Sequence, residues 1–503
     1  MRNRRLGPRP APSARALRPP PAPSPLVTAP AIPASLPPMP AIVSPIDGKP
    51  IYHFDQQDLG GALATLARAE AAQREFVRTT TIAERAAILL RMLECYGAHL
   101  DEYAEQITRM MGKPLAHARG EYKGGFTARA RHLAAIAEHA LRDLVISDGA
   151  DGIRRFIRRE PVGVVLLIAA WNYPLLVPIN ALAAAFLAGD AILLKHAPQT
   201  ALVAEQLERA FREAGAPEGV VQALHADHPT IARLLDTRRL GYVSFTGSVR
   251  GGHEVYRAVA HHNFIGVGME LGGKDPAIVL PDAQVELAAV NLVDGAFFNA
   301  GQSCCAVERI YVHRSIYEPF IAAFVDEVHR YVVGDPLDPA TNLGPVVTPQ
   351  AAQRVRDQAQ DALARGARRL SDDARFRVPD LSRCYLAPQV FDRVDHTMEL
   401  MREESFGPII GIMAFDTEDE AIALANDSRY GLTASVWTQD DARALALAER
   451  LEAGTVFQNR CDYLDPALAW TGVKDSGHGV SLSELGFHPV TRPKSFHLRS
   501  RLT

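Results

Sequence analysis

The stretch VGVVLLIAAWNYPLLVPINALAAAFLAGDAILLK, residues 162–195, decides the fold. Val162–Ala169 is an apolar run of strand length, which is typical of a strand buried on both faces of a parallel sheet. Pro174–Leu187 is long enough for a helix, and Ala191–Lys195 reads as a second buried strand. This strand, helix and strand in succession predict two parallel strands joined by a helical crossover.

The alternation continues along the chain and defines the fold class. Such an order is typical of an α/β protein with a doubly wound parallel sheet and helices on both faces. Helical patterns fill Gln57 to Leu144, and a second α/β series begins near Pro276. The other elements that we predict are helix Thr200–Ala214, strands Gly219–Leu224 and Tyr242–Phe245, a helix after Gly247, helix Val285–Phe298, strand Arg309–Val312, and helices Tyr317–Val333 and Pro349–Arg365.

The composition excludes several classes of protein. A chain of 503 residues is too long for one compact core, so two or three domains are expected. The formal net charge is −4, whereas nucleic-acid-binding domains are strongly basic. No apolar run reaches the roughly 18 residues that a spanning helix needs. We expect a soluble protein that binds neither nucleic acid nor membranes.

The cysteines predict free thiols. They are scattered, odd in number and without a CxxC pair or the spacing of zinc ligands, so neither a disulfide framework nor a metal site is expected. Reduced thiols fit a cytoplasmic compartment and leave one or more cysteines available for chemistry. The five are Cys95, Cys304, Cys305, Cys384 and Cys461.

The N-terminal segment differs from the rest of the chain. Residues 1–40 hold 13 of the 35 prolines, six arginines and no acidic residue, which predicts a disordered segment over residues 1–42. Three interpretations remain open: a mitochondrial targeting segment, a proline-rich ligand for a small recognition domain, or a start codon placed too early, with Met39 as the true initiator.

A pair of cysteines gives the first chemical signal, in the run FNAGQSCC at residues 298–305. The nucleophilic form of cysteine is the thiolate, which a positive dipole favours and a nearby acid would disfavour. The pair lies in a small turn after a predicted helix, without a flanking acid. The run alone leaves two readings open: a nucleophile, or two small buried hydrophobic residues.

A carboxylate between glycines gives the second signal, in GMELGGK at residues 268–274. Glu270 at a strand end is positioned for general-base catalysis, and the glycines permit a ligand to approach the backbone closely. The alternative is a structural glutamate paired with Lys274.

A candidate phosphate site lies in FTGSVRGG at residues 245–252. The run follows a strand and opens a helix, so free backbone N–H groups would face an anion. A helix cap by Ser248 or Thr246 is the alternative. A dinucleotide fingerprint starting at Gly266 fails, because Leu271 occupies its third glycine position.

Together these runs resemble the aldehyde dehydrogenase superfamily, of the NAD(P)-dependent type that releases the acid by hydrolysis. Glu270 and Cys304 lie 34 positions apart, as the base and the nucleophile of that family usually do. The resemblance extends from about Ser44 to the C-terminus. Further motifs in family order are AWNYP at 170–174, LLK at 193–195, EESFGP at 403–408, NDSRYGL at 426–432, GTVFQN at 454–459 and KDSG at 474–477.

The resemblance implies a mechanism and a cofactor site. Cys304 would attack the aldehyde, Glu270 would activate the hydrolytic water, and the Asn172 amide with the Cys304 N–H would stabilise the oxyanion. The cofactor would be NAD, with NADP also compatible, and no metal is implied. Its contacts would be Lys195 at the adenine ribose, Gly247 and Ser248 at the pyrophosphate, Glu404 and Phe406 at the nicotinamide ribose, and Trp171 beside the site.

The resemblance also implies a substrate pocket. Departures from the family pattern bear on the cofactor, the proton relay and the class of aldehyde. After Lys195 the run His196-Ala197-Pro198 lacks the acid that disfavours NADP, and His196 could favour NADP. Asn180-Ala181 puts a lysine-assisted proton relay in doubt. Charged residues at Arg460, Asp462 and Asp465 favour a polar or charged aldehyde, such as a semialdehyde or aminoaldehyde. The implied pocket residues are Tyr173, Val177, Asn180, Ser303, Cys305, Leu464 and Trp470.

The family fold would divide the chain into three parts. A Rossmann-type cofactor domain would span residues 43–142 and 160–270, and an α/β catalytic domain residues 271–472. A small β oligomerisation hairpin at 143–159 would pair with the tail at 488–503, in a homodimer or homotetramer. Two rival functions stay open: a CoA-acylating dehydrogenase, and a catalytically idle binding protein on the same fold.

Overall fold

The computed structural model describes residues 41–150 and 152–499, which belong to one compact unit. The predicted disorder of the N-terminal segment falls outside the described residues, except at Ala41 and Ile42, which belong to a strand, so the predicted boundary at residue 42 is wrong. Within the described ranges no helix is both long and apolar enough to span a membrane. All five cysteines are free thiols, as predicted.

The N-terminal part is a short β hairpin followed by helices. Strands β1 (Ala41–Val43) and β2 (Pro50–His53) pair antiparallel. Thr81 and Glu84 form a capping box at the start of α2, which fixes where that helix begins. The helices are α1 (Leu59–Thr79), α2 (Ile82–Gly97), α3 (Leu100–Met111), α4 (Leu115–Glu121) and α5 (Thr127–Ala140), with a π-helical turn at Tyr122–Phe126 between the last two.

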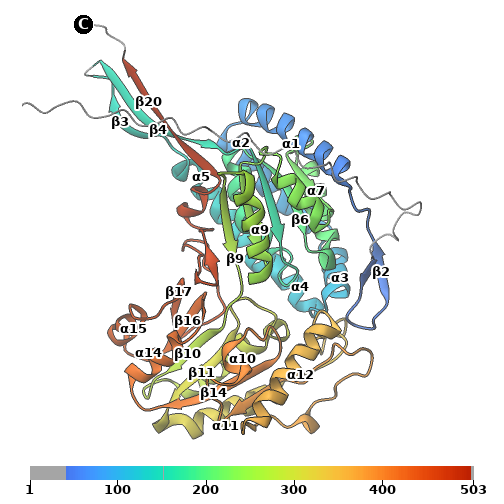
Figure 1. Cartoon of the computed structure of the whole chain (residues 1–503), viewed down its shortest axis with the longest axis vertical. Coiled ribbons are helices and arrows are strands. Elements are labelled where there is room, and N and C mark those ends of the chain that lie inside the picture. Colours follow the sequence, from blue (N-terminus) through green and yellow to red (C-terminus); the bar gives the residue numbers. More distant parts are fainter. Residues whose placement is uncertain (1–40, 151, 500–503) are drawn as a thin grey trace, which may run out of the picture. The chain divides into compact units, whose positions relative to one another are not determined.

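The predicted doubly wound sheet is confirmed (Figure 1). Its strand order is β19-β9-β8-β5-β6-β7, with β5 to β9 parallel and β19 antiparallel at the edge. Because the order reverses between β5 and β8, their carboxyl ends open a crevice of the kind in which such folds bind ligands. The bounds are β5 (Val164–Ala169), α6 (Leu176–Ala188), β6 (Ala191–His196), α7 (Leu202–Glu213), β7 (Val221–Ala223), α8 (His228–Leu235), β8 (Tyr242–Thr246), α9 (Val249–His262), β9 (Gly266–Glu270) and β19 (Gly477–His478).

A second sheet follows, in the order β12-β13-β14-β11-β10-β16-β17. Its strands are parallel except for β12, which is antiparallel to β13. Its elements are β10 (Asp275–Val279), α10 (Val285–Phe297), β11 (Val307–His313), α11 (Tyr317–Val328), α12 (Pro349–Ala364), β12 (Arg368–Arg369), β13 (Gln389–Asp392), α13 (Glu399–Arg402), β14 (Ile409–Phe415), α14 (Glu418–Asn426), β16 (Thr433–Trp437), α15 (Asp441–Ala448) and β17 (Thr455–Gln458). Strands β15 (Tyr430–Gly431) and β18 (Val473–Lys474) pair separately.

One predicted helix is too long. The helix expected over Tyr317–Val333 ends at Val328, because the chain there leaves the helix to pair with a later loop. Val333 bridges to Leu343, and the Asn342 side chain accepts a hydrogen bond from Val332 N–H at 2.7 Å.

The predicted hairpin and tail form a three-stranded antiparallel sheet in the order β20-β4-β3 (Figure 1). Strands β3 (Leu144–Asp148) and β4 (Ile153–Pro161) are the hairpin, and β20 (Thr491–Arg499) is the tail, paired with β4 over its whole length. The pairing occurs within one chain. A role for this sheet in oligomerisation stays a prediction.

Candidate active site

Cys304 lies in a loop whose backbone is held in a rare conformation. After α10 the 3₁₀ turn Phe298–Gly301 places Asn299, Ala300 and Gly301 at φ 54°, 57° and 69°. A Cβ at Gly301 would lie 2.3 Å from the Gly407 carbonyl oxygen, so glycine is required there. The Asn299 amide donates to the carbonyls of Asn172 and Gln302, each at 3.1 Å, which joins this loop to the loop after β5. The strained turn therefore fixes the position of the thiol.

Glu270 ends β9 and borders the same cavity as Cys304. Its Oε1 accepts a hydrogen bond from the Ser481 hydroxyl at 2.6 Å. Burial raises the pKa of Glu270, and this effect is opposed by the Ser481 hydrogen bond and by the Arg129 charge. The alternative pairing with Lys274 is wrong, since Lys274 is buried against Glu308 at 2.6 Å.

The glycines after Glu270 serve the protein's own packing. A Cβ at Gly272 would lie 2.5 Å from the Glu404 carboxylate, and one at Gly273 would lie 2.3 Å from the Cys304 carbonyl oxygen. Gly273 N–H also donates to Glu404 at 3.1 Å. The close approach predicted for a ligand is thus made here by Glu404 and Cys304.

Cys304, Glu270 and every predicted pocket residue line one cavity of about 460 Å³. Side chains from α6, the cysteine loop and the loop after β17 meet there, although they lie far apart in the sequence. The predicted pocket residues in this lining are Tyr173, Val177, Asn180, Ser303, Cys305, Leu464 and Trp470.

Ionisable groups that the sequence did not single out also line this cavity. His117 stacks on Phe298 with ring centroids 4.3 Å apart, and burial lowers its pKa to about 4. Arg129 on α5 is buried, donates from Nη1 to Asn180 at 3.0 Å and leaves Nε without an acceptor. Glu121 pairs with the buried Lys113. The cavity is polar as well as apolar.

The predicted polar residue Asp462 faces the cysteine pair. Its Oδ1 accepts hydrogen bonds from the Cys305 thiol at 2.9 Å and the Ser303 hydroxyl at 3.2 Å. Burial raises the pKa of Asp462 to about 7, against the lowering effect of these two donors. The hydrogen bond with Cys304 and burial raise the pKa of Cys305, which therefore stays a thiol beside the nucleophile candidate.

Two hydrogen-bond donors lie next to Cys304. Asn172 follows β5, is buried, and donates from Nδ2 to the Gln302 carbonyl at 3.2 Å, which leaves its second N–H unused. The backbone N–H of Cys304 has no acceptor among the described residues. Unused donors beside a nucleophile are what an oxyanion requires.

A larger cavity of about 1150 Å³ occupies the crevice at the carboxyl ends of β5 and β8. Lys195, Gly247, Ser248 and Trp171 line it, as predicted for cofactor contacts. It shares Thr246 with the cavity that Cys304 and Glu270 line. Glu404 and Phe406 are not in its lining; Phe406 instead packs edge-on against Trp171, with ring centroids 5.6 Å apart.

The larger cavity fits the phosphates and ribose of a dinucleotide. Ser248 caps α9 by accepting from Gly251 N–H at 3.2 Å, and the other first-turn N–H groups stay available to an anion. The Ser248 cap is confirmed and does not exclude an anion at this helix start, so the phosphate site stays a prediction. Lys195 is buried and has no carboxylate partner in the part of the chain that the structure describes.

His196 is not in the lining of this cavity but borders, with Lys195, an adjoining cavity of about 330 Å³, and its role with NADP stays a prediction. Its Nε2 bonds the Pro174 carbonyl at 3.0 Å and its Nδ1 the Thr200 hydroxyl at 2.8 Å. Burial lowers the pKa of His196 to about 4 and keeps the ring neutral. The described residues contain no cluster of His, Cys, Asp and Glu arranged to bind a metal.

Known proteins resemble this chain over most of its length. A model of the aldehyde dehydrogenase family matches residues 36–496. An aldehyde dehydrogenase of Paenarthrobacter nicotinovorans is 36% identical over 90% of this chain and 98% of that protein. A succinate semialdehyde dehydrogenase [NAD(P)+] of Escherichia coli is 36% identical over 82% of this chain and 87% of that protein. The crystal structure of a succinic semialdehyde dehydrogenase from Streptococcus pyogenes with NADP+ superposes with a TM-score of 0.86 at 28% identity, over 91% of this chain and 99% of that one.

Proposed function

Because this chain belongs to the aldehyde dehydrogenase family and is an NAD(P)-dependent oxidoreductase, we propose that it oxidises an aldehyde to the carboxylic acid through a thioester on Cys304, which Glu270 helps to hydrolyse. The observation that carries the proposal is that Cys304 and Glu270 line one cavity. This cavity meets the cofactor crevice at Thr246.

In the first half of the reaction the Cys304 thiolate adds to the aldehyde carbon. The carbonyl oxygen becomes an oxyanion, which accepts hydrogen bonds from the Asn172 amide and the Cys304 N–H; one such donor is worth about 3–4 kcal/mol in a transition state. The bound nicotinamide supplies the acceptor for the hydride that leaves the same carbon. The acyl group is then held as a thioester on Cys304.

In the second half Glu270 takes a proton from a water molecule, and the resulting hydroxide adds to the thioester carbon. The carbon–sulfur bond breaks, the carboxylic acid leaves, and the Cys304 thiolate is regenerated. The Ser481 hydrogen bond fixes the orientation of the Glu270 carboxylate. Lys195 and the start of α9 would hold the ribose and phosphates of the cofactor, and Glu404 with Phe406 its nicotinamide end.

The activity is tested with a panel of aliphatic, aromatic, amino- and carboxy-aldehydes, each assayed with NAD and with NADP. We expect one carboxylic acid for each reduced cofactor without CoA. We also expect the lowest KM for polar or charged aldehydes, because Arg129, His117 and Asp462 line the cavity. Turnover that requires CoA and yields acyl-CoA would instead assign the acylating reaction, and no turnover of any aldehyde would favour an idle binding protein.

The cofactor preference depends on Lys195. With no carboxylate beside it, the wild-type enzyme is expected to use NADP as well as NAD. Lys195→Ala should raise the KM for NADP roughly 10- to 100-fold, since a hydrogen bond to a charged group is worth about 1.5–3 kcal/mol. The KM for NAD should rise less. Lys195→Arg keeps the positive charge, so its KM for NADP should be lower than that of Lys195→Ala. Equal increases for both cofactors would contradict this assignment.

A further inference from the structure

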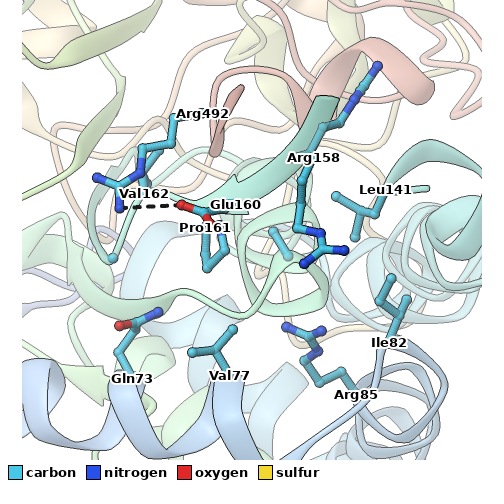
Figure 2. Close-up of a pocket in the computed structure, with 13 residues that line it drawn as sticks. Gln73, Val77, Ile82, Arg85, Leu141, Arg158, Glu160, Pro161, Val162 and Arg492 are labelled. Atoms are coloured by element: carbon cyan, nitrogen blue, oxygen red, sulfur yellow. Dashed lines mark ion pairs between the residues drawn. The ribbon is translucent and has the colours of Figure 1, made fainter. Parts of the chain in front are cut away.

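Another cavity, of about 490 Å³, lies between the helices α1 and α2 and the base of the three-stranded sheet. It shares no lining residue with the catalytic cavity or the cofactor crevice. Figure 2 shows Arg85 on the helical side and Arg492 with Glu160 on the strand side. The described side chains of its lining include four arginines, Arg85, Arg158, Arg159 and Arg492, and one carboxylate, that of Glu160.

Arg85 is a buried cation with one donor nitrogen, Nη1, that has no acceptor among the described residues. Its side chain lies on α2 with the residue 6% exposed, and Nε donates to the Thr81 carbonyl at 3.2 Å. The Asp190 carboxylate is close enough to attract this charge, but it accepts the Gly163 N–H at 2.7 Å, and no hydrogen bond joins it to Arg85 among the described residues. An unpaired buried guanidinium is costly and suggests a missing anion.

The other arginines differ in how far they are paired. Arg158 is satisfied by a bidentate pair with Asp143, at 3.0 and 2.8 Å. Arg159 leaves a buried Nη1 without an acceptor. Arg492 reaches Glu160 only at 3.8 Å, and Glu160 is held more closely by Lys494 at 2.9 Å. Three guanidinium groups around the cavity therefore retain donors for a ligand.

The rest of the lining is largely apolar. Val77 and Ile82 approach from the helical side, Leu141 follows α5, and Val162 precedes β5. A cavity of this size falls within the range of small-molecule sites, which combine an apolar lining with a few placed polar groups. The cavity thus suits a ligand that has both an anionic end and an apolar body.

We propose that this cavity binds a small organic oxyanion, a phosphate ester or a carboxylate with an apolar body. Its oxygens accept hydrogen bonds from Arg85, Arg159 and Arg492, since the guanidinium fork matches the oxygens of both groups. The ligand would join α2 to strands β4 and β20 and so stabilise the sheet against the helices.

Phenyl phosphate, benzoate and inorganic phosphate serve as probes, titrated by calorimetry into the full chain at constant ionic strength. Saturating NADP is present throughout to block the phosphate site at α9. We expect phenyl phosphate or benzoate to bind at least about tenfold more tightly than inorganic phosphate, because only they fill the apolar part. Binding of phenyl phosphate alone assigns a phosphate ester, and binding of benzoate alone assigns a carboxylate.

Variants locate the site. Arg159→Gln and Arg492→Gln should each weaken binding roughly tenfold or more, as expected for a lost hydrogen bond to a charge. Arg154→Gln is the matched control, because Arg154 lies on the same strand but outside the cavity lining, and it should bind like the wild type. Arg85→Gln is less suitable, since its buried position makes misfolding a competing cause. Affinity that is unchanged in both variants, or no binding of any probe, would overturn the proposal.

Discussion

A Cys304→Ser variant is expected to lose at least about 10³-fold in the rate of cofactor reduction, because removal of a nucleophile eliminates the covalent route. Serine preserves the shape of the side chain, but its hydroxyl stays protonated and is a far weaker nucleophile. The cofactor crevice does not include residue 304, so NAD(P) should bind with unchanged affinity. The absorbance of the reduced nicotinamide and the quenching of protein fluorescence by the cofactor measure the two effects separately.

Cys305→Ser is the matched control for this experiment. Cys305 is buried and donates to Asp462, a hydrogen bond that a serine hydroxyl can also make. We expect this variant to retain most of the activity. If Cys305→Ser were inactive while Cys304→Ser still turned over, the assignment of the nucleophile would be wrong.

Glu270→Gln is expected to slow steady-state turnover by roughly 10²- to 10⁴-fold, the usual contribution of a general base. The first turnover should remain fast, since the thioester forms before Glu270 is needed. Rapid mixing should therefore give a burst of reduced cofactor equal to the enzyme concentration, followed by a slow phase. Ser481→Ala, which removes the hydrogen bond to the Glu270 carboxylate, should give a smaller loss of the same kind. If the rate of the first turnover fell as much as the steady-state rate, Glu270 would have to act before the thioester forms.

The pH dependence follows from the same residue. Glu270 acts as a base only in its carboxylate form, and burial raises its pKa. Hydrolysis should therefore be fastest above this raised pKa and should decline as the pH falls through it. The acidic limb of the kcat profile should disappear in Glu270→Gln.

The sequence predicts the parallel sheets well because each of their buried strands is a continuous apolar run. Val164–Ala169 and Ala191–His196 are buried apolar runs, and the intervening helix is long and apolar. The end of α11 at Val328 was missed for the opposite reason: it depends on the pairing of Val333 with Leu343, which lies beyond the helical pattern. Tertiary contacts of this kind leave no periodic signal.

The predicted site residues lie in recognisable motifs, whereas the groups that surround them do not. Arg129 and His117 belong to helices whose sequence gives no reason to turn those side chains toward a cavity, and they meet Cys304 only through packing. The structural role of His196 depends on the carbonyl of Pro174 and the hydroxyl of Thr200. The sequence therefore identifies the reacting groups better than it identifies the shape and charge of the pocket.

The central claim is that the acyl group is carried by Cys304 and released with the help of Glu270. The most direct test is to quench Glu270→Gln with acid after one turnover and to map the peptides by mass spectrometry. The account predicts that the peptide containing Cys304 carries the mass of the acyl group, that Cys305 is unmodified, and that Cys304→Ser shows no adduct. An adduct on any other residue, or the free acid formed at once with no adduct, would contradict it.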